Sequence, residues 1–345
     1  MDAAQRPPWL ASTARGPNNI NDDCVAHVRS WNSVNHNEAL SNRRTAGFPS
    51  PLTIAIMAPK TIIMQPCFEP GFNDLRFSTP SVRPQKEVIR MDPLDRFRLD
   101  GRVVVVTGAS SGLGVGFAKA LARVGADLVL AARREQQLIA VAEELRGRGA
   151  RVITHRTDVA VEEDCASLAQ AAADAFGPID VLINNAGVGQ AGGALREDPQ
   201  VFRTTVDINL TGTYLVSRAC VPHMPSGSAI VNIASVLGVA ASRFPQAGYC
   251  ASKAGVVGLT RDLAQQWSAR RGIRVNALCP GYFESEITAG DGAEALRAMV
   301  AAESILGRFG HQQELDSALL FLASPASSYM TGASLVVDGG LTSTF

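Results

Sequence analysis

Residues 103–114 read VVVVTGASSGLG and decide the fold of this 345-residue chain. The apolar, β-branched run at residues 103–106 is typical of a strand that is buried on both faces of a parallel sheet. A glycine-rich turn follows, and then the helical spacing of Phe117, Leu121 and Val124. Such a strand, turn and helix form a nucleotide-binding unit, because glycines let the backbone approach a pyrophosphate and the helix N-terminus offers free N–H groups. The alternative is an ordinary tight turn between a strand and a helix.

The next predicted strand, residues 127–131, leads into Arg133 and Arg134 rather than into a carboxylate. In NAD-binding units an acidic residue at this place holds the ribose hydroxyls of the nucleotide. An arginine fork pairs well with a phosphate group. The sequence therefore favours NADP(H), which carries a 2′-phosphate, and leaves NAD(H) as the second choice. The alternative is that the two arginines are solvated at the start of a helix.

Strand and helix patterns alternate from residue 91 onward. Further strands are predicted at residues 151–155, 181–183, 228–234, 273–278 and 334–337. Helices are predicted at residues 135–147, 162–176, 199–221, 249–270 and 312–323, with a mobile, mixed segment at 282–304. About seven strands separated by helices predict a single α/β domain, a doubly wound parallel sheet of the Rossmann type with helices on both faces.

Residues 1–90 differ from the rest of the chain in composition. More than half of the 18 prolines precede residue 91, and residues 1–50 are rich in Asn, Ser and Arg without a helical or strand period. Such composition is typical of loops or disorder. We interpret residues 1–90 as a dispensable, low-complexity or disordered N-terminal extension and residues 91–345, which begin at Met91, as the folded domain. The alternative is a tethering or regulatory segment that uses the apolar patch at residues 52–64.

Charge and cysteine content point away from several classes of function. Lys+Arg and Asp+Glu balance at 32 each, so the charge total gives no hint of a nucleic acid or a membrane as partner. The six cysteines have no CxxC or His-paired spacing, which indicates neither a metal site nor a disulfide framework. No signal peptide is predicted, and the apolar patch at residues 52–64 is too short and too interrupted to span a membrane. We expect a cytoplasmic protein.

Tyr249 and Lys253 are four residues apart in the sequence YCASK. If a helix begins near Tyr249, the two side chains lie on one face, one turn apart. A tyrosine hydroxyl titrates near pH ~10, and a lysine cation close by lowers that pKa toward the range of an acid–base catalyst. Ser235, at the end of the apolar run AIVNIAS, can hydrogen-bond the same substrate oxygen that Tyr249 protonates. The alternative is a tyrosine and a lysine that only share a helix face.

Other polar residues stand at strand ends or inside an apolar helix. Asp158, beside Val159, follows one predicted strand, where an aspartate can bind the adenine amino group. The sequence NNAG, which ends at Gly187, follows another strand, at the edge of a parallel sheet where ligands bind. Asn209 lies in an otherwise apolar predicted helix. Because buried amides need partners, Asn209 is either a structural hydrogen-bonding residue or part of a proton path.

In their order and spacing, these motifs resemble the short-chain dehydrogenase/reductase family over the whole of residues 91–345. The resemblance is to the branch of 3-oxoacyl-carrier-protein reductases and sugar-alcohol or gluconate dehydrogenases. The motifs are the glycine turn from Thr107 to Gly114, Asp158, Asn184 to Gly187, Asn209, Ser235, Tyr249 with Lys253, and Pro280 with Gly281. Each motif is weak alone, whereas the full ordered set is very specific. The extension at residues 1–90 is the main departure from the family pattern.

The resemblance implies roles for four catalytic residues. Tyr249 would be the general acid/base, and Ser235 would hold and polarise the substrate oxygen. Lys253 would bind the nicotinamide ribose and lower the pKa of Tyr249. Asn209 would keep a water that connects Lys253 to bulk solvent.

The motifs and the resemblance together also predict how the chain holds the cofactor. The predicted cofactor-binding residues are Gly108, Ser110, Ser111, Gly112, Leu113 and Gly114 at the phosphates, Arg133, Asp158 and Val159 at the adenosine, Asn185, Ala186, Gly187, Tyr249 and Lys253 at the ribose and nicotinamide, and Pro280, Gly281, Phe283 and Ser285 at the carboxamide. Ser285 stands where the family usually has threonine, an exchange that keeps the hydroxyl.

These features predict an NAD(P)(H)-dependent oxidoreductase that interconverts a ketone and a secondary alcohol and prefers NADP(H). The predicted partner is a small carbonyl or alcohol substrate, covered by the segment at residues 282–304. The resemblance also implies a homotetramer or dimer. The alternative is a regulator or scaffold that binds the cofactor without turnover, and the intact set of Asn209, Ser235, Tyr249 and Lys253 argues against it.

Overall fold

Seven parallel strands form one sheet in the part of the chain that the computed structural model describes, residues 92–241, 244–284, 288 and 293–344. The strands are β1 (Val103–Thr107), β2 (Asp127–Ala132), β3 (Val152–Arg156), β4 (Val181–Asn184), β5 (Ala229–Ile233), β6 (Arg274–Pro280) and β7 (Ser334–Val337). Their order in the sheet is β3-β2-β1-β4-β5-β6-β7, and every neighbouring pair is parallel. The chain therefore winds outward in both directions from β1 and β4. The predicted doubly wound sheet is confirmed.

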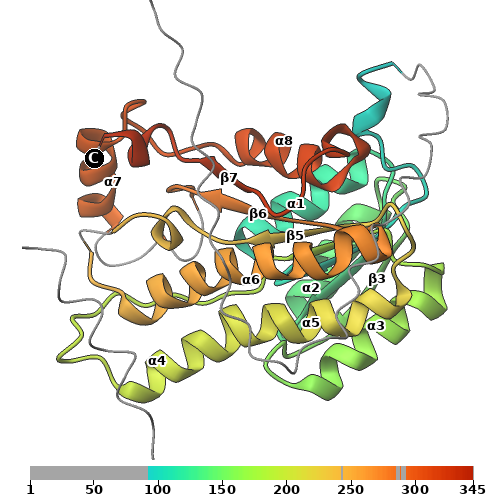
Figure 1. Ribbon diagram of the computed structural model, residues 1–345, viewed down its shortest axis with the longest axis horizontal. Coiled ribbons are helices and arrows are strands. Elements are labelled where there is room, and N and C mark those ends of the chain that lie inside the picture. The colour runs from blue at the N-terminus through green and yellow to red at the C-terminus, as the bar shows by residue number, and fades with distance from the viewer. Residues whose placement is uncertain (1–91, 242–243, 285–287, 289–292, 345) are drawn as a thin grey trace, which may run out of the picture. The chain divides into compact units, whose positions relative to one another are not determined.

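Helices cover both faces of this sheet (Figure 1). They are α1 (Gly112–Arg123), α2 (Glu135–Arg146), α3 (Glu162–Phe176), α4 (Pro199–Val206), α5 (Gly212–Cys220), α6 (Ala247–Arg271), α7 (Ala293–Glu303) and α8 (Gln312–Ala323). The apolar side chains of α1, α2 and α8 form the core on one face, and those of α3, α5 and α6 form the core on the other.

Strand β1 shows why its sequence is apolar throughout. Val104 and Val106 belong to the core under α1, α2 and α8, whereas Val103 and Val105 belong to the core that Leu168 of α3 completes. All four valines are buried. Because successive side chains of a strand point to opposite faces, a strand covered on both sides needs apolar residues at every position.

Most predicted elements agree with the structure to within two residues at each end. The helix predicted at residues 199–221 consists of α4 and α5, joined by a π-helical turn, Asp207–Thr211. The prediction of a mixed segment at residues 282–304 is wrong for its second half, which forms α7. The α7 sequence AEALRAMVAAE consists mainly of strong helix formers, so local propensity accounts for the helix.

Residues 1–90 and Ser285 lie outside the described residues, and the prediction of a dispensable extension stays a prediction. Among the described helices, none combines the length and the apolar content that a membrane span requires. The described residues also contain no group of three or more His, Cys, Asp or Glu side chains that could hold a metal ion.

Candidate active site

A cavity of about 680 Å³ lies at the carboxyl ends of the strands, around the point where β1 and β4 diverge. Its wall includes Gly108 after β1, Ser235 after β5 and Gly281 after β6. In doubly wound sheets, ligands bind in this crevice. The predicted site residues that the structure describes all line the cavity, except Gly114 and Asn209.

The turn between β1 and α1 requires glycine at two close approaches. Gly108 has a φ angle of +65°, and a Cβ there would stand 2.8 Å from the Cα of Ala186. A Cβ on Gly114, in the first turn of α1, would clash with the carbonyl oxygen of Gly108. Backbone therefore packs on backbone, and α1 begins directly at the cavity edge. Gly114 packs the helix onto the turn, and its predicted role at the cofactor phosphates stays a prediction.

Thr107 and Asn185 join the ends of β1 and β4. The Asn185 side chain donates to the carbonyl oxygens of Thr107 (3.0 Å) and Gly108 (3.2 Å). In return, Thr107 Oγ1 accepts from the backbone N–H groups of Asn185 (3.0 Å) and Ala186 (3.1 Å). The Asn185 amide thus fixes the glycine-rich turn. Thr107 thus has a structural role that the sequence pattern did not indicate, although its place before the first glycine of the turn is a usable signal.

Both arginines after β2 lie at the edge of this turn. Arg134 donates through Nε to Ser110 Oγ (3.3 Å) and through Nη2 to Ser111 Oγ. Arg133 Nη1 lies 3.8 Å from Asp158 Oδ2, and its side chain is 55% exposed. The two guanidinium groups therefore place positive charge beside the cavity. Arg134 forms hydrogen bonds with the glycine-rich turn, whereas Arg133 pairs with Asp158.

Tyr249 and Lys253 lie on one face of α6, which begins two residues before Tyr249. Both line the cavity. Lys253 is only 4% exposed, and its Nζ donates to the carbonyl oxygen of Ile233 at the end of β5 (2.7 Å). The same Nζ lies 5.7 Å from the centre of the Tyr249 ring. Both side chains therefore reach the wall of the same cavity, Lys253 buried and Tyr249 half-buried.

Burial shifts the pKa values of this pair in opposite directions. It raises the pKa of Tyr249 to about 12, and the hydrogen bond with Ser235 opposes the rise. It lowers the pKa of Lys253 to about 8. The expectation that Lys253 lowers the pKa of Tyr249 is not met in this structure, because loss of solvation outweighs every favourable contact of the phenolate. At pH 7 the phenol is neutral and most of the lysine is protonated.

Ser235 stands directly after β5 and is 6% exposed. Its extended backbone begins the short 3₁₀ turn Val236–Gly238, and its hydroxyl accepts from the backbone N–H of Leu237 (3.1 Å). Because the serine oxygen accepts this bond, the hydroxyl keeps its own proton for a second partner, and Ser235 also forms a hydrogen bond with Tyr249. Ser235 and Tyr249 thus present two hydroxyl groups at one place.

Asn209 lies in the π-helical turn between α4 and α5 and is fully buried. Its Oδ1 accepts from the backbone N of Val188 (2.8 Å), and its Nδ2 donates to the carbonyl oxygen of Val188 (2.9 Å) and to Ser252 Oγ (3.0 Å). These bonds support the structural role that the sequence left open. They hold the wall at Val188 against α6, next to Lys253. A π-helical turn at such a place is common in functional sites.

The segment after β6 closes the cavity near Tyr249. Gly281 donates to the carbonyl oxygen of Val337 in β7 (2.8 Å) and lines the cavity with Pro280. Phe283 is 4% exposed, and its ring belongs to the core under α8, where it packs against Gly310. Phe283 thus belongs both to this core and to the cavity wall, and its predicted contact with the carboxamide stays a prediction.

The cavity wall opposite the glycine-rich turn consists of residues that no sequence motif indicated. They are mainly apolar or aromatic: Val188, Ala191, Leu237, Phe244, Tyr282 and Leu296, with Gln246 as a polar member. They come from the loops after β4, β5 and β6 and from α7. No local motif marks them, because only the tertiary fold brings these loops together.

The sequence matches the model of the family described as Enoyl-(Acyl carrier protein) reductase over residues 108–342. A cis-4-hydroxycyclohexanecarboxylate dehydrogenase of Sinomonas cyclohexanicum is 43% identical over 244 residues, which cover 70% of this chain and 96% of that protein. A 3-oxoacyl-[acyl-carrier-protein] reductase of Thermotoga maritima is 35% identical over 246 residues, which cover 71% of this chain and 99% of that protein.

Solved structures agree with these sequence matches. A gluconate 5-dehydrogenase from Burkholderia cenocepacia J2315, in complex with NADP and tartrate, has a TM-score of 0.70 and 36% identity and covers 74% of this chain and 100% of that one. The strand order, the placement of Ser235, Tyr249 and Lys253 and these likenesses point to one conclusion. The chain belongs to the short-chain dehydrogenase/reductase family of oxidoreductases, in the branch of 3-oxoacyl-carrier-protein reductases and gluconate dehydrogenases.

Proposed function

We propose that the protein interconverts a ketone and a secondary alcohol with NADP(H) as its cofactor. The observation that carries this proposal is the meeting of Ser235, Tyr249 and Lys253 in one cavity that ends, at its other side, at the glycine-rich turn. The residues present fit a dinucleotide. The backbone at the start of α1 has no side-chain cap and would hold its phosphates, and the small residues Ala186 and Gly187 would leave room for a flat ring.

Tyr249 is the general acid in ketone reduction and the general base in alcohol oxidation. Its phenol proton passes to the carbonyl oxygen of the substrate, and Ser235 donates a hydrogen bond to the same oxygen. The bound cofactor supplies or accepts the hydride. With its pKa raised to about 12, Tyr249 carries its proton at pH 7 and is in the protonation state that ketone reduction requires.

Lys253 makes the reverse direction feasible. As a base, Tyr249 must lose its proton, and a cation on the same face of α6 stabilises the resulting phenolate. In our proposal the Lys253 ammonium also binds the ribose of the cofactor. Asn209 acts behind it, either by holding Val188 and Ser252 in place or by keeping a water that links Lys253 to solvent.

The preference for NADP(H) over NAD(H) rests on Arg133 and Arg134. A 2′-phosphate on the adenosine ribose would lie where these guanidinium groups flank Ser110 and Ser111. Asp158 pairs with Arg133, so the negative charge of this carboxylate at the cavity edge is neutralised. The likeness to a gluconate 5-dehydrogenase crystallised with NADP supports this choice.

The substrate proposal is a small secondary alcohol or ketone with an apolar body. The apolar wall around Leu237 and Leu296 supports it. The name of one relative, a cis-4-hydroxycyclohexanecarboxylate dehydrogenase, includes a secondary alcohol on an apolar ring and also supports it, whereas that of a galactitol 2-dehydrogenase supports only the secondary alcohol. We further propose that residues 91–345 carry the activity in the cytoplasm as a homotetramer or dimer, which the mass in solution would test.

The test is NADPH consumption by the purified protein against a panel of cyclic and linear ketones, with NADH in parallel and Tyr249→Phe as the matched control. We expect turnover with NADPH that the control lacks. A wild-type protein that binds NADPH tightly and oxidises it with no ketone in the panel would instead identify a cofactor-binding regulator.

A further inference from the structure

The turn after β7, residues 338–344 and here called the C-terminal turn, is organised by one carboxylate. Asp338 accepts hydrogen bonds from the backbone N of Gly340 (2.9 Å), from the backbone N of Thr342 (2.7 Å) and from the Thr342 hydroxyl (2.8 Å). Just before the turn, Val337 accepts from the backbone N of Gly281, which lines the cavity. The C-terminal turn is thereby fixed next to the wall of the active site.

Leu341 points from the C-terminal turn into a small apolar cluster that is separate from the two main cores. It is 6% exposed and packs with Val236 and Leu237. Val236 and Leu237 line the cavity, whereas Leu341 does not, so Leu341 stands behind the wall that a substrate would touch. Tyr249 packs against the same cluster. One side chain near the end of the chain thus supports both the wall and the tyrosine.

The C-terminal turn also holds the end of α7. Thr344 Oγ1 donates to the carbonyl oxygen of Glu303 (3.1 Å), and Leu306 N donates to the carbonyl oxygen of Gly339 (3.0 Å). Figure 1 shows the C-terminal turn, in red, beside α7. Both contacts lie at or just after the carboxyl end of the helix, so the turn holds that end of α7 in place.

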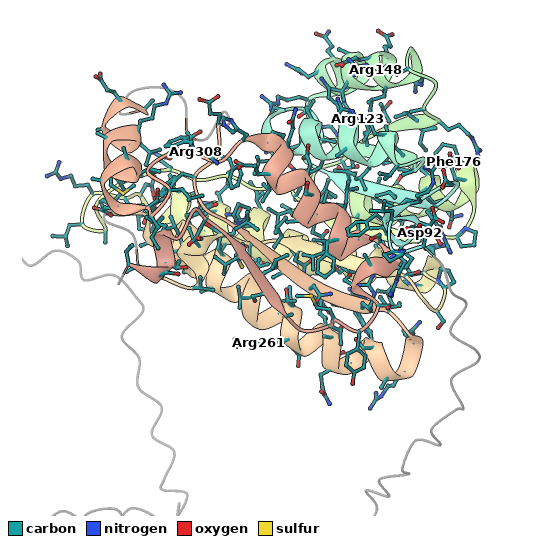
Figure 2. All side chains as sticks on the ribbon, turned by 90° about the horizontal axis from the view of Figure 1, so that it is seen from above. Asp92, Arg123, Arg148, Phe176, Arg261 and Arg308 are labelled. Carbon is teal, nitrogen blue, oxygen red and sulfur yellow. The ribbon has the colours of Figure 1, made fainter. Side chains whose placement is uncertain are left out.

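The other face of α7 reaches the cavity. Leu296 lines the cavity, and Arg297, one residue on, pairs with Glu284 (3.1 Å) after β6. Arg308, labelled in Figure 2 beside α7, pairs with Glu314 at the start of α8 (2.8 Å) and steadies the connection between the two helices. α7 is therefore held from both sides, and the C-terminal turn is the support that also reaches Tyr249.

We propose that Leu341 is a positioning residue for substrate specificity, and that the C-terminal turn couples the Val236–Leu237 wall to α7 so that one element sets the size of the substrate end. The proposal rests on the proposed ketone reductase activity and adds the residue that limits substrate size. Leu341 acts through Leu237 and Tyr249 and does not touch the substrate.

The first test compares Leu341→Ala with the wild type on 4-methyl-, 4-ethyl- and 4-tert-butylcyclohexanone with NADPH. Removing the leucine opens space behind Leu237, so the kcat/KM ratio of the bulkiest to the smallest ketone should rise by roughly tenfold, mainly through KM. Leu341→Met, which restores the volume, should return the ratio to the wild-type value. Leu195→Ala is the matched control, because Leu195 is fully exposed, and it should leave the ratio unchanged.

The second test needs no turnover. Backbone amide hydrogen exchange is measured in α7 and α1 for the wild type, Leu341→Ala and Thr344→Val. Loss of the support should make the α7 amides exchange roughly fivefold faster in both variants, with α1 unchanged. Thr344→Val removes the contact with Glu303 but keeps Leu341 and its cluster, so faster exchange in this variant comes from the loss of the α7 contact alone.

The outcomes separate the two proposals. If the wild type reduces none of the ketones but α7 loosens in both variants, the reductase proposal fails and the coupling stands. If the wild type is active but Leu341→Ala keeps the size preference and the α7 exchange rate of the wild type, the inference on the C-terminal turn is wrong. A Leu341→Ala variant that loses all ketones equally, with unchanged α7 exchange, would also contradict it.

Discussion

The two ends of the cavity are built in different ways. The cofactor end is backbone packed on backbone: Gly108 lies against Ala186, and Asn185 and Thr107 tie the two strand ends together. The substrate end is a wall of side chains, such as Leu237 and Leu296, that reach the cavity from loops and from α7. The first arrangement allows little variation in sequence, whereas the second can change residue by residue. One end therefore reveals the family, and the other is free to determine the substrate.

The largest expected effect lies where the two ends meet. Tyr249→Phe should lower turnover by roughly 10²–10⁴-fold, the usual contribution of general acid–base catalysis, while the Kd for NADPH stays within a factor of two. The measurement is steady-state kinetics together with NADPH binding by fluorescence. If the variant kept more than a tenth of the wild-type rate, the proton would have to come from another group.

The second prediction concerns the charge at the cofactor end. Arg134→Ala and Arg133→Ala should each weaken NADPH binding by roughly 10–100-fold, because hydrogen bonds to a charged group contribute about 1.5–3 kcal/mol. NADH binding should change little, since NADH has no 2′-phosphate. We expect the larger loss at Arg134, which bonds to both turn serines. Equal losses for the two nucleotides would mean that the arginines support the turn only.

The third prediction contrasts a glycine at each end. Gly108→Ala should lower the free energy of unfolding by roughly 2–4 kcal/mol, because alanine is strained at φ +65° and its Cβ would press on Ala186. Gly193→Ala is the matched change in the loop that follows the Val188 wall, where an added Cβ meets nothing within 4 Å. It should stay within about 0.5 kcal/mol of the wild type in urea unfolding. Similar losses at both positions would contradict the contrast.

The same contrast explains what the sequence could predict. The strand 103–106, the glycine turn and the Tyr249–Lys253 pair are local patterns, so their elements and their place at the strand ends were predicted correctly. The substrate wall and the support by Leu341 depend on contacts between residues about a hundred positions apart, which no local pattern encodes. Gly114 and the Phe283 ring pack in ways that the sequence did not indicate, because a motif gives the position of a residue but not the direction of its packing.

The pKa of Tyr249 was mispredicted for a related reason. The spacing of Tyr249 and Lys253 suggested only their mutual attraction, whereas burial is a property of the whole fold. In the structure burial is the largest cause of both pKa shifts, and it raises the pKa of Tyr249 and lowers that of Lys253. The direction of a pKa shift therefore depends on how deeply the group is buried as well as on the charge next to it.

The smallest predicted effect measures that burial directly. Lys253 has a pKa of about 8 in the folded protein, below its ordinary value of about 10.4 in an unfolded chain. Between these two values the unfolded state binds more protons, so Lys253 should make the free energy of unfolding rise with pH, by at most about 1.4 kcal/mol per pH unit. Tyr249, with its raised pKa of about 12, has the opposite effect above pH ~10.

The difference between the wild type and Lys253→Met isolates the lysine, because every other titrating group is common to both proteins. Urea unfolding at pH 7, 8, 9 and 10, without cofactor, should show the wild type gaining stability relative to Lys253→Met from pH 8 upward and not below. The lysine lies between the cofactor end and the substrate end of the cavity. The pH profile therefore reports how far water is excluded from Lys253 in the ligand-free protein. A difference in the free energy of unfolding that stays constant from pH 7 to pH 10 would mean that water reaches Lys253. Tyr249 and Lys253 would then lie in a solvated part of the cavity, and burial would not explain their pKa values.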